Sequence, residues 1–279
     1  MGQSLSGSAL PPPCPGAIVV ASGNPGRGSV LLHFSIVSYN IHRAIGVDRR
    51  FLPRRIAEVL SHHDADVVLL QEVDDGAPRS RELDMAPKLA EDLGYSYYAV
   101  GHNVTLRKGR YGNATLSRFP ILRERNIDLT VGTRKRRGCQ HTRIRMEKLR
   151  GFPHELDVFN LHLGLSSRER AKQLGILSHS QEFSQLNGSA ACVVGGDFND
   201  WRARLHPIFT EILDFHCATQ RRRSLNGSFR TYPSFSPTGG LDRIYYRGPM
   251  RLVSSRACRL RASRVASDHL PVIAEFEIH

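Results

Sequence analysis

The stretch Ala190-Ala-Cys-Val-Val-Gly-Gly-Asp-Phe-Asn-Asp200 joins an apolar run to a group of polar residues. The run from Ala190 to Val194 predicts a buried strand, and Asp197 and Asn199 follow at its end. Side chains two positions apart in extended chain point the same way, and sites in open α/β sheets are usually built at strand ends. A carboxylate beside a carboxamide suits phosphoester hydrolysis. A Gly-Asp turn with an Asx hydrogen bond is equally compatible with the five residues from Gly196 to Asp200 alone.

Composition limits the classes of protein to which the chain can belong. Its 279 residues suffice for one large α/β domain or two small ones, and 40% hydrophobic with 23% charged residues is ordinary for a globular protein. The net charge of +13 and the pI of about 10.1 favour a polyanionic partner, either nucleic acid or an anionic lipid surface. A solvated basic surface without a specific partner is the alternative. No apolar stretch approaches the roughly 18 residues that cross a membrane.

Cysteine spacing and the N-terminal composition bear on location and domain organisation. The five cysteines are widely spaced, without the pairs of a structural zinc site or a disulfide framework, which favours a reducing, cytoplasmic location. Residues 1–33 are rich in Gly, Ser and Pro and are interpreted as a disordered lead. Residues 34–279 contain no linker, so we expect them to form one domain. We also expect the protein to be a monomer.

Strand and helix patterns alternate after this lead, which indicates a layered α/β architecture. Pro53 begins a predicted helix that continues through His63, and Gly94 ends a second at 84–93. Ser166 and Glu169 form the pattern of a capping box for a third helix, which is expected to reach residue 186. Strands are predicted at 34–39, 66–70, 97–100, 113–116, 142–146, 156–161, 190–194, 241–246, 251–254 and 272–278.

Polar residues suited to metal binding or proton transfer occur at the ends of several of these strands. Each one alone is more typical of a cap or a turn. Together they comprise only Asn, Glu, Asp and His, and their oxygen atoms are hard ligands suited to Mg²⁺ or Mn²⁺. The sequence contains neither cysteine pairs nor a His-Glu-x-x-His motif, which argues against a zinc hydrolase. In chain order they are Asn40, Glu72, His162, Asp197, Asn199, Asp242, Asp268 and His269.

In this order, the residues and their neighbours resemble the motifs of the endonuclease/exonuclease/phosphatase superfamily, which includes deoxyribonucleases, neutral sphingomyelinases and inositol polyphosphate 5-phosphatases. The resemblance spans residues 34–278 and implies an α/β four-layer sandwich, two packed mixed β-sheets flanked by helices. The named residues would converge at one end of it. The matching motifs are Ser38-Tyr39-Asn40, Leu70-Gln71-Glu72-Val73, Tyr111-Gly112-Asn113-Ala114, Leu116-Ser117-Arg118, Asn160-Leu161-His162-Leu163, Gly196-Asp197-Phe198-Asn199, Leu241-Asp242-Arg243 and Ser267-Asp268-His269.

The resemblance also implies roles for the metal and the water. Glu72 would be the main ligand of a Mg²⁺ or Mn²⁺ cofactor, with Asn40 beside it and Asp268 ligating the metal or holding its water. The ion would screen the charge of the phosphate and stabilise the leaving oxygen. Asp197, positioned by Asn199, would orient or deprotonate the water that attacks in line, without a covalent intermediate.

Two histidines would complete the site. Asp242 is expected to hydrogen-bond His269 and to raise its pKa, so that His269 holds the phosphate or acts as an acid or a base. His162 would contact the phosphate or the leaving group from the opposite side, and Asn113 would line the phosphate pocket.

Other basic and aromatic residues allow two interpretations each. His62 and His63 end a predicted helix, where cationic side chains suit the helix dipole. Trp201, the only tryptophan, is expected to pack against the strand end. The basic run at 133–137 is interpreted as a phosphate-binding loop, with a solvated charge run as the alternative. Its candidate substrate-binding residues are Arg134, Arg136 and Arg137.

The substrate is predicted less closely than the chemistry. The basic charge favours an endonuclease or exonuclease acting on nucleic acid. The alternative is a phosphodiesterase or phosphatase for sphingomyelin or a phosphoinositide, because an anionic membrane attracts the same arginine-rich loops. A non-catalytic nucleic-acid-binding protein is the remote alternative, and the presence of both Glu72 and His269 argues against it.

Overall fold

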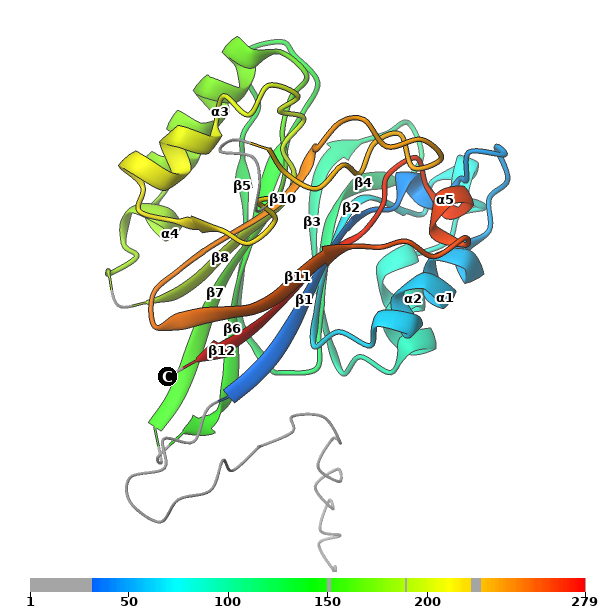
Figure 1. Cartoon of the computed structure of the whole chain (residues 1–279). Coiled ribbons are helices and arrows are strands. Elements are labelled where there is room, and N and C mark those ends of the chain that lie inside the picture. Colours follow the sequence, from blue (N-terminus) through cyan, green and yellow to red (C-terminus); the bar gives the residue numbers. More distant parts are fainter. Residues whose placement is uncertain (1–31, 150–151, 189, 222–226, 279) are drawn as a thin grey trace, which may run out of the picture.

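Two mixed β-sheets of six strands each pack face to face, with helices on both outer faces (Figure 1). The structure is a computed structural model and describes residues 32–149, 152–188, 190–221 and 227–278. The α/β four-layer sandwich predicted from the motifs is therefore confirmed. The predicted lead at 1–33 lies outside the described residues except for its last two positions, which already belong to the first strand.

The first sheet carries the N-terminal and C-terminal strands side by side. Helices α1 (Pro53–His63), α2 (Met85–Leu93) and the short α5 (Ser263–Ala266) lie on its outer side (Figure 1). Gly94 and Asp64 adopt the left-handed conformation that ends α2 and α1. In spatial order its strands are β11 (Met250–Ala257), β12 (Val272–Ile278), β1 (Leu32–Asn40), β2 (Val67–Asp75), β4 (Arg110–Ser117) and β3 (Tyr97–Thr105).

The second sheet is covered by α3 (Ser167–His179) and α4 (Gln181–Ser184) (Figure 1). The prediction of one helix over 166–186 is wrong, because Ser180 is extended and its hydroxyl oxygen accepts the Phe183 backbone N–H that begins α4. The capping box is also absent, since Ser166 makes no side-chain cap hydrogen bond. In spatial order the strands are β5 (Ile121–Asp128), β6 (Gly138–Leu149), β7 (Phe152–His162), β8 (Ala191–Asp197), β10 (Asp242–Arg247) and β9 (His216–Cys217).

An apolar layer between the sheets holds the sandwich together. Removing such side chains from water contributes roughly 25 cal/mol per Å² of apolar surface, which is the main driving force for packing the two sheets. The layer is fully or almost fully buried and includes Phe34, Ile36, Leu69, Val158, Val193, Ile244 and Phe276.

Strand pairing brings the polar strand ends together. Strands β1 and β2 run parallel, with Asn40 opposite Gln71. Strands β7 and β8 are also parallel, with His162 opposite Asp197, and antiparallel β10 places Asp242 on the other side of Asp197. The ends that carry these residues lie at the upper end of the molecule in Figure 1, away from the C-terminus.

Two backbone irregularities shape this end of the sandwich. Strand β2 does not end at Glu72, as predicted, but continues to Asp75 through a bulge between Leu70 and Val73, in which Glu72 has a φ of 57°. A bulge of this kind re-aims a side chain without ending the strand. Before Asp197, Gly196 has a φ of 141°, and a Cβ there would lie 1.9 Å from the Leu161 carbonyl oxygen. Glycine is therefore required where β8 approaches β7.

Candidate active site

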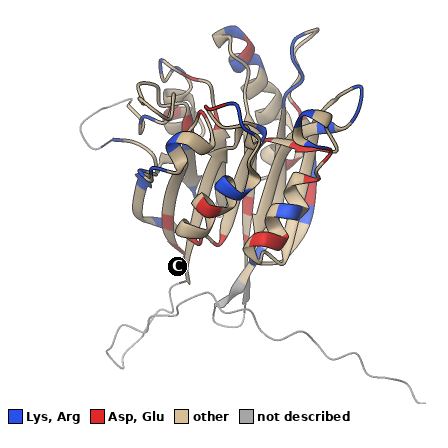
Figure 2. Cartoon of the chain, turned by 90° about the vertical axis from the view of Figure 1, so that its right-hand side faces the viewer, with Lys and Arg blue, Asp and Glu red and all other residues tan. Residues whose placement is uncertain are grey.

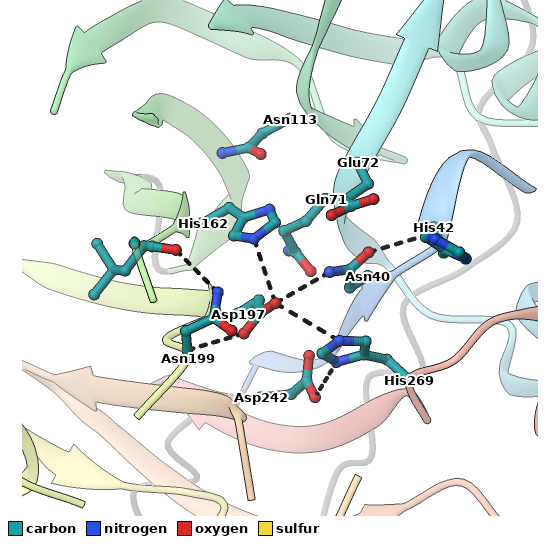
Figure 3. A network of polar contacts seen from close by, with 12 residues as sticks. Asn40, His42, Gln71, Glu72, Asn113, His162, Asp197, Asn199, Asp242 and His269 are labelled. Carbon is teal, nitrogen blue, oxygen red and sulfur yellow. Dashed lines mark hydrogen bonds and ion pairs between the residues drawn. The ribbon is translucent and has the colours of Figure 1, made fainter. Parts of the chain in front are cut away.

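Asp197 is the centre of a buried polar network that joins both sheets (Figure 3). Its carboxylate is 2% exposed. Oδ2 accepts a hydrogen bond from Asn40 Nδ2 at 3.1 Å and lies 3.5 Å from His162 Nε2 and 3.7 Å from His269 Nε2. The first sheet contributes Asn40, the second contributes His162 and Asp197, and the segment before β12 contributes His269. The structure thus brings together four of the residues selected from the sequence.

Asn199 positions Asp197 by a different geometry from the predicted one. With a φ of 50°, Asn199 is not extended, so its side chain does not point the same way as that of Asp197. Its backbone N–H donates to Asp197 Oδ1 at 2.9 Å, and its own Nδ2 donates to the Leu163 carbonyl at 2.9 Å. The sequence allowed either an Asx turn or a polar site at these residues. In the structure the Asx turn itself holds Asp197 in the polar site.

Asp242 and His269 form a buried ion pair. His269 Nδ1 lies 2.9 Å from Asp242 Oδ2, which also accepts the hydroxyl of Thr231. Burial alone would lower the pKa of His269, but the carboxylates of Asp242 and Asp197 outweigh it and raise this pKa to about 10. Burial also raises the pKa of Asp197, against the opposing charge of His269. His269 is therefore an imidazolium at neutral pH and faces a carboxylate that is more basic than an ordinary aspartate.

His162 has the opposite protonation preference. It is buried, and burial together with the charges of Arg137, His269 and Lys135 holds its pKa well below the ordinary value. A neutral imidazole and an imidazolium therefore lie on two sides of Asp197. Their different charge states suit different tasks in one reaction.

Of the residues predicted to hold a metal, Asn40 belongs to this network, and Glu72 and Asp268 lie beside it. Glu72 points toward the Asn40 amide (Figure 3), and its Oε2 lies 3.5 Å from Arg43 Nε. Asp268 Oδ1 lies 3.8 Å from Nδ1 of His42, whose backbone N–H donates to Asn40 Oδ1 at 3.0 Å. Carboxylate and amide oxygens of this kind are the donors that Mg²⁺ and Mn²⁺ prefer, so Glu72 and Asn40 fit a divalent ion.

A second group of potential ligands lies within the network itself. Asp197, Asp242 and His269 each place one potential ligand atom within 4.8 Å of the others. A metal ligand must be deprotonated, however, and the two carboxylates stabilise the proton on His269. The oxygen atoms near Glu72 are therefore the better fit for a divalent ion.

The predicted phosphate-binding loop places its basic residues in three environments. Arg134 Nη1 lies 3.6 Å from Glu169 Oε2, and Arg136 is exposed. Arg137 is only 6% exposed, and its Nε has no hydrogen-bond partner among the described residues. Lys135, which was not selected from the sequence, has its Nζ 5.6 Å from the centre of the Tyr111 ring. Figure 2 shows Lys and Arg in several loops at this upper end.

Buried amides connect the two sheets beneath the site. Asn160 donates to the carbonyls of Leu70 and Ala114 at 3.1 and 2.9 Å, and Gln71 donates to Asn160 Oδ1 at 2.8 Å. Asn113 donates to the carbonyls of Gly138 and Asn160 at 3.2 and 3.0 Å. Both amide hydrogens of Asn113 are thus used within the protein, which leaves none to donate to a phosphate in this conformation.

An exposed aromatic rim borders His269. The Tyr232 ring lies 4.9 Å from the His269 ring, and Trp201 meets Tyr232 edge to face at 5.7 Å between centroids. Trp201 is 55% exposed and Phe235 is 62% exposed. The prediction that Trp201 packs against the strand end is therefore wrong. Its ring lies over Gly239 and leaves more than half of its surface to solvent.

The sandwich is the fold of a family of phosphoester hydrolases. The model of the Endonuclease/Exonuclease/phosphatase family matches residues 37–269, and the chain belongs to this family. No helix within the described ranges is long and apolar enough to cross a membrane.

The chain is also similar to individual proteins. The uncharacterized protein YbhP of Escherichia coli K12 is 32% identical over 254 residues, which cover 88% of this chain and 96% of YbhP. A family structure from Beutenbergia cavernae is similar at 20% identity and a TM-score of 0.70, over 88% of this chain and 72% of that one. The mannosyl-6-phosphatase Bt3783 of Bacteroides thetaiotaomicron is similar at 20% identity and a TM-score of 0.65, over 87% and 99%. These structural similarities concern the fold.

Asp242→Asn is expected to change how stability depends on pH. The pKa of His269 is about 10 in the folded chain and about 6.5 in the unfolded chain. Between pH 6.5 and pH 10 the folded chain therefore retains a proton that the unfolded chain has released. The free energy of unfolding therefore falls as the pH rises from 6.5 to 10. Asp242→Asn removes the closest carboxylate, so this fall should shrink by a few kcal/mol, since one pKa unit is about 1.4 kcal/mol.

Urea unfolding at pH 6.5 and pH 10 measures this difference, and the His269 resonance in NMR reports its pKa directly. Asp157→Asn is the matched control, because Asp157 is also buried and pairs with a histidine, His141, at 2.7 Å. An unchanged His269 pKa in Asp242→Asn would contradict the prediction.

Proposed function

We propose that the chain is a Mg²⁺- or Mn²⁺-dependent phosphodiesterase that cleaves nucleic acid by in-line attack of water. The observation that supports this most is the environment of Asp197, a buried carboxylate with a raised pKa between a neutral and a protonated histidine. A carboxylate in this state accepts a proton from water more readily than an ordinary aspartate.

Each residue of the network has a task in this proposal. Asp197, held by Asn199 and Asn40, orients the water and accepts its proton. The His269 imidazolium neutralises charge on the phosphate, and Asp242 keeps that imidazolium protonated. His162 contacts the phosphate or the leaving group from the other side. These fixed charges favour the transition state because they need no reorganisation during the reaction.

The metal would be held by Glu72 and Asn40, with Asp268 nearby. When bound, such an ion screens the phosphate charge and stabilises the leaving oxygen. Adding Mg²⁺ or Mn²⁺ to the metal-free protein and measuring which ion restores activity identifies the metal.

The surroundings of the network favour nucleic acid as the substrate. Arg137 and Lys135 have no carboxylate partner within the described part of the chain and suit a phosphate. Trp201, which lies against Tyr232 beside His269, and Phe235 expose aromatic rings. Cations beside exposed aromatic rings are typical of single-stranded nucleic-acid binding, in which the rings stack on bases. The net charge of +13 supports the same proposal.

A phospholipid phosphodiesterase or phosphatase is the second candidate. Leu165 is 75% exposed, and together with Trp201 and Phe235 it gives apolar side chains that an anionic membrane surface would also accommodate. The fold similarity to a mannosyl-6-phosphatase adds sugar phosphates to the substrates worth testing.

A substrate panel tests the proposal. The full chain is incubated with Mg²⁺ or Mn²⁺ and plasmid DNA, abasic duplex, RNA, sphingomyelin, phosphoinositides or mannose 6-phosphate. We expect cleavage of DNA or RNA, and no cleavage by an Asp197→Asn preparation purified in parallel, which excludes a contaminating nuclease. Hydrolysis of lipids or sugar phosphates alone would refute the nuclease proposal.

A further inference from the structure

A basic hollow of about 850 Å³ lies on the flank of the first sheet, apart from the catalytic network. It is bordered by the C-terminal end of α1, the end of β11, α5 and the segment 229–237. Five arginines line it, and we call it the arginine hollow. They are Arg221, Arg230, Arg256, Arg259 and Arg264.

The positive charge of the arginine hollow is largely uncompensated. Among the residues that the structure describes, no aspartate or glutamate lines it. Within the described ranges, Arg256 alone of the five arginines pairs with a carboxylate, that of Glu275 at 2.7 Å. Cations gathered around a concave surface focus a positive potential and raise the local concentration of anions. An anion bound here would relieve the mutual repulsion of the arginines.

His63, at the C-terminal end of α1, is one of the residues that line the arginine hollow. Its Nε2 is buried and has no hydrogen-bond partner in the described chain. Burial, with the charges of His62 and Arg256, lowers the pKa of His63 to about 4, so its imidazole is neutral at physiological pH. The expectation that His63 acts as a helix-capping cation is therefore wrong. A buried nitrogen without a partner has a desolvation cost that a ligand hydrogen bond removes.

The floor of the arginine hollow is apolar and turned away from the catalytic network. Cys258 and Leu270 are 2% and 5% exposed, and Phe229 lines the same side. Leu270 lines the hollow, whereas its neighbour His269 faces Asp197, so the two side chains point to opposite sides of one segment. A ligand in the hollow therefore does not occupy the catalytic network.

We propose that the arginine hollow is a second binding site, which takes a small organic anion with at least two phosphate groups. Five arginines exceed what one phosphate can engage, because a guanidinium binds a phosphate through paired hydrogen bonds. The volume lies within the roughly 300–1,000 Å³ typical of small-molecule sites, and the apolar floor suits the carbon skeleton of the ligand. A free oligophosphate and the headgroup of a phosphorylated lipid share this chemistry.

Calorimetric titration of the full chain with inorganic triphosphate tests the proposal, in EDTA to remove divalent ions. The variant Arg259→Ser/Arg264→Ser changes two exposed arginines of the hollow. Arg123→Ser/Arg261→Ser removes the same charge from exposed arginines that do not line it, and is the matched control. We expect wild type and control to bind alike, and the hollow variant to bind at least about 100-fold more weakly, roughly tenfold per arginine.

A second measurement locates the ligand. Triphosphate should shift the imidazole resonances of His63 in wild type and leave them unshifted in the hollow variant, while phosphodiesterase activity is the same in all three proteins. Inositol hexakisphosphate and vesicles containing phosphatidylinositol bisphosphate then distinguish a free ligand from a lipid headgroup. The proposal would be overturned if wild type and the hollow variant bound triphosphate with equal affinity, or if the His63 resonances did not shift. It would also be overturned if the protein bound long oligonucleotides but did not bind triphosphate.

Discussion

Replacing Asp197 by asparagine is expected to lower kcat for phosphodiester hydrolysis by about 1,000-fold, within the range that positioned acid–base groups contribute. Asparagine has nearly the same shape but cannot accept a proton from water. It also removes the negative charge that faces His162 and His269 at 3.5 and 3.7 Å. The KM should change less than kcat, because the substrate meets this carboxylate through the attacking water.

Steady-state kinetics on a chromogenic phosphodiester with saturating divalent metal measures the effect. Asp157→Asn is the control, since Asp157 is also buried but pairs with His141 and Arg143 within the second sheet, outside the network. We expect that variant to retain most of the wild-type kcat even if its thermal unfolding temperature falls. A folded Asp197→Asn protein with more than about a tenth of the wild-type kcat would rule out Asp197 as the base.

The convergence of the site was predictable because its residues stand at the ends of strongly patterned strands. Apolar, β-branched runs such as 190–194 predict strands. The order of the motifs along the chain then predicts that Asp197 lies near His162 and Asp242. The register confirms this, with both residues directly opposite Asp197. Strand β5 was missed for the converse reason, since most of its side chains are exposed and it contains no apolar run.

Local backbone geometry at the site was not predictable, because tertiary pairing determines it. The bulge that holds Glu72 exists because β4 pairs with β2 on both sides of it. The left-handed turn at Asn199 is stabilised by the Leu163 carbonyl, a residue 36 positions away. Neither contact leaves a pattern in the neighbouring sequence, whereas Gly196 before Asp197 was at least a visible sign of close backbone approach.

Charge runs were ambiguous in the sequence because burial, which composition does not reveal, decides their meaning. Within the run 133–137, Arg136 is exposed while Arg137 is almost completely buried. The arginine hollow shows the same limit over longer distances. Its lining comes from α1, from Arg221, from 229–237 and from 255–270, and only the tertiary fold brings these segments together.

Glu72→Gln is expected to make hydrolysis depend on much higher metal concentrations. At a fixed low concentration of Mg²⁺ or Mn²⁺ it should lower the apparent kcat by about 1,000-fold, since a bound ion contributes several kcal/mol to the transition state. Glutamine keeps an oxygen donor at the bulge but loses the negative charge that hard divalent cations require. The half-saturating metal concentration should therefore rise more strongly than the KM for substrate. This pattern separates a metal ligand from a residue that contacts the substrate directly.

Activity measured across a metal titration, with the KM determined at each concentration, tests this prediction. Glu277→Gln is the matched control, because Glu277 is also a glutamate beside an arginine, Arg251, but is buried on β12 away from the network. It should leave the metal dependence unchanged. If Glu72→Gln retained the wild-type metal dependence while its KM rose, Glu72 would be a substrate contact, and the proposed metal position beside Asn40 would be wrong.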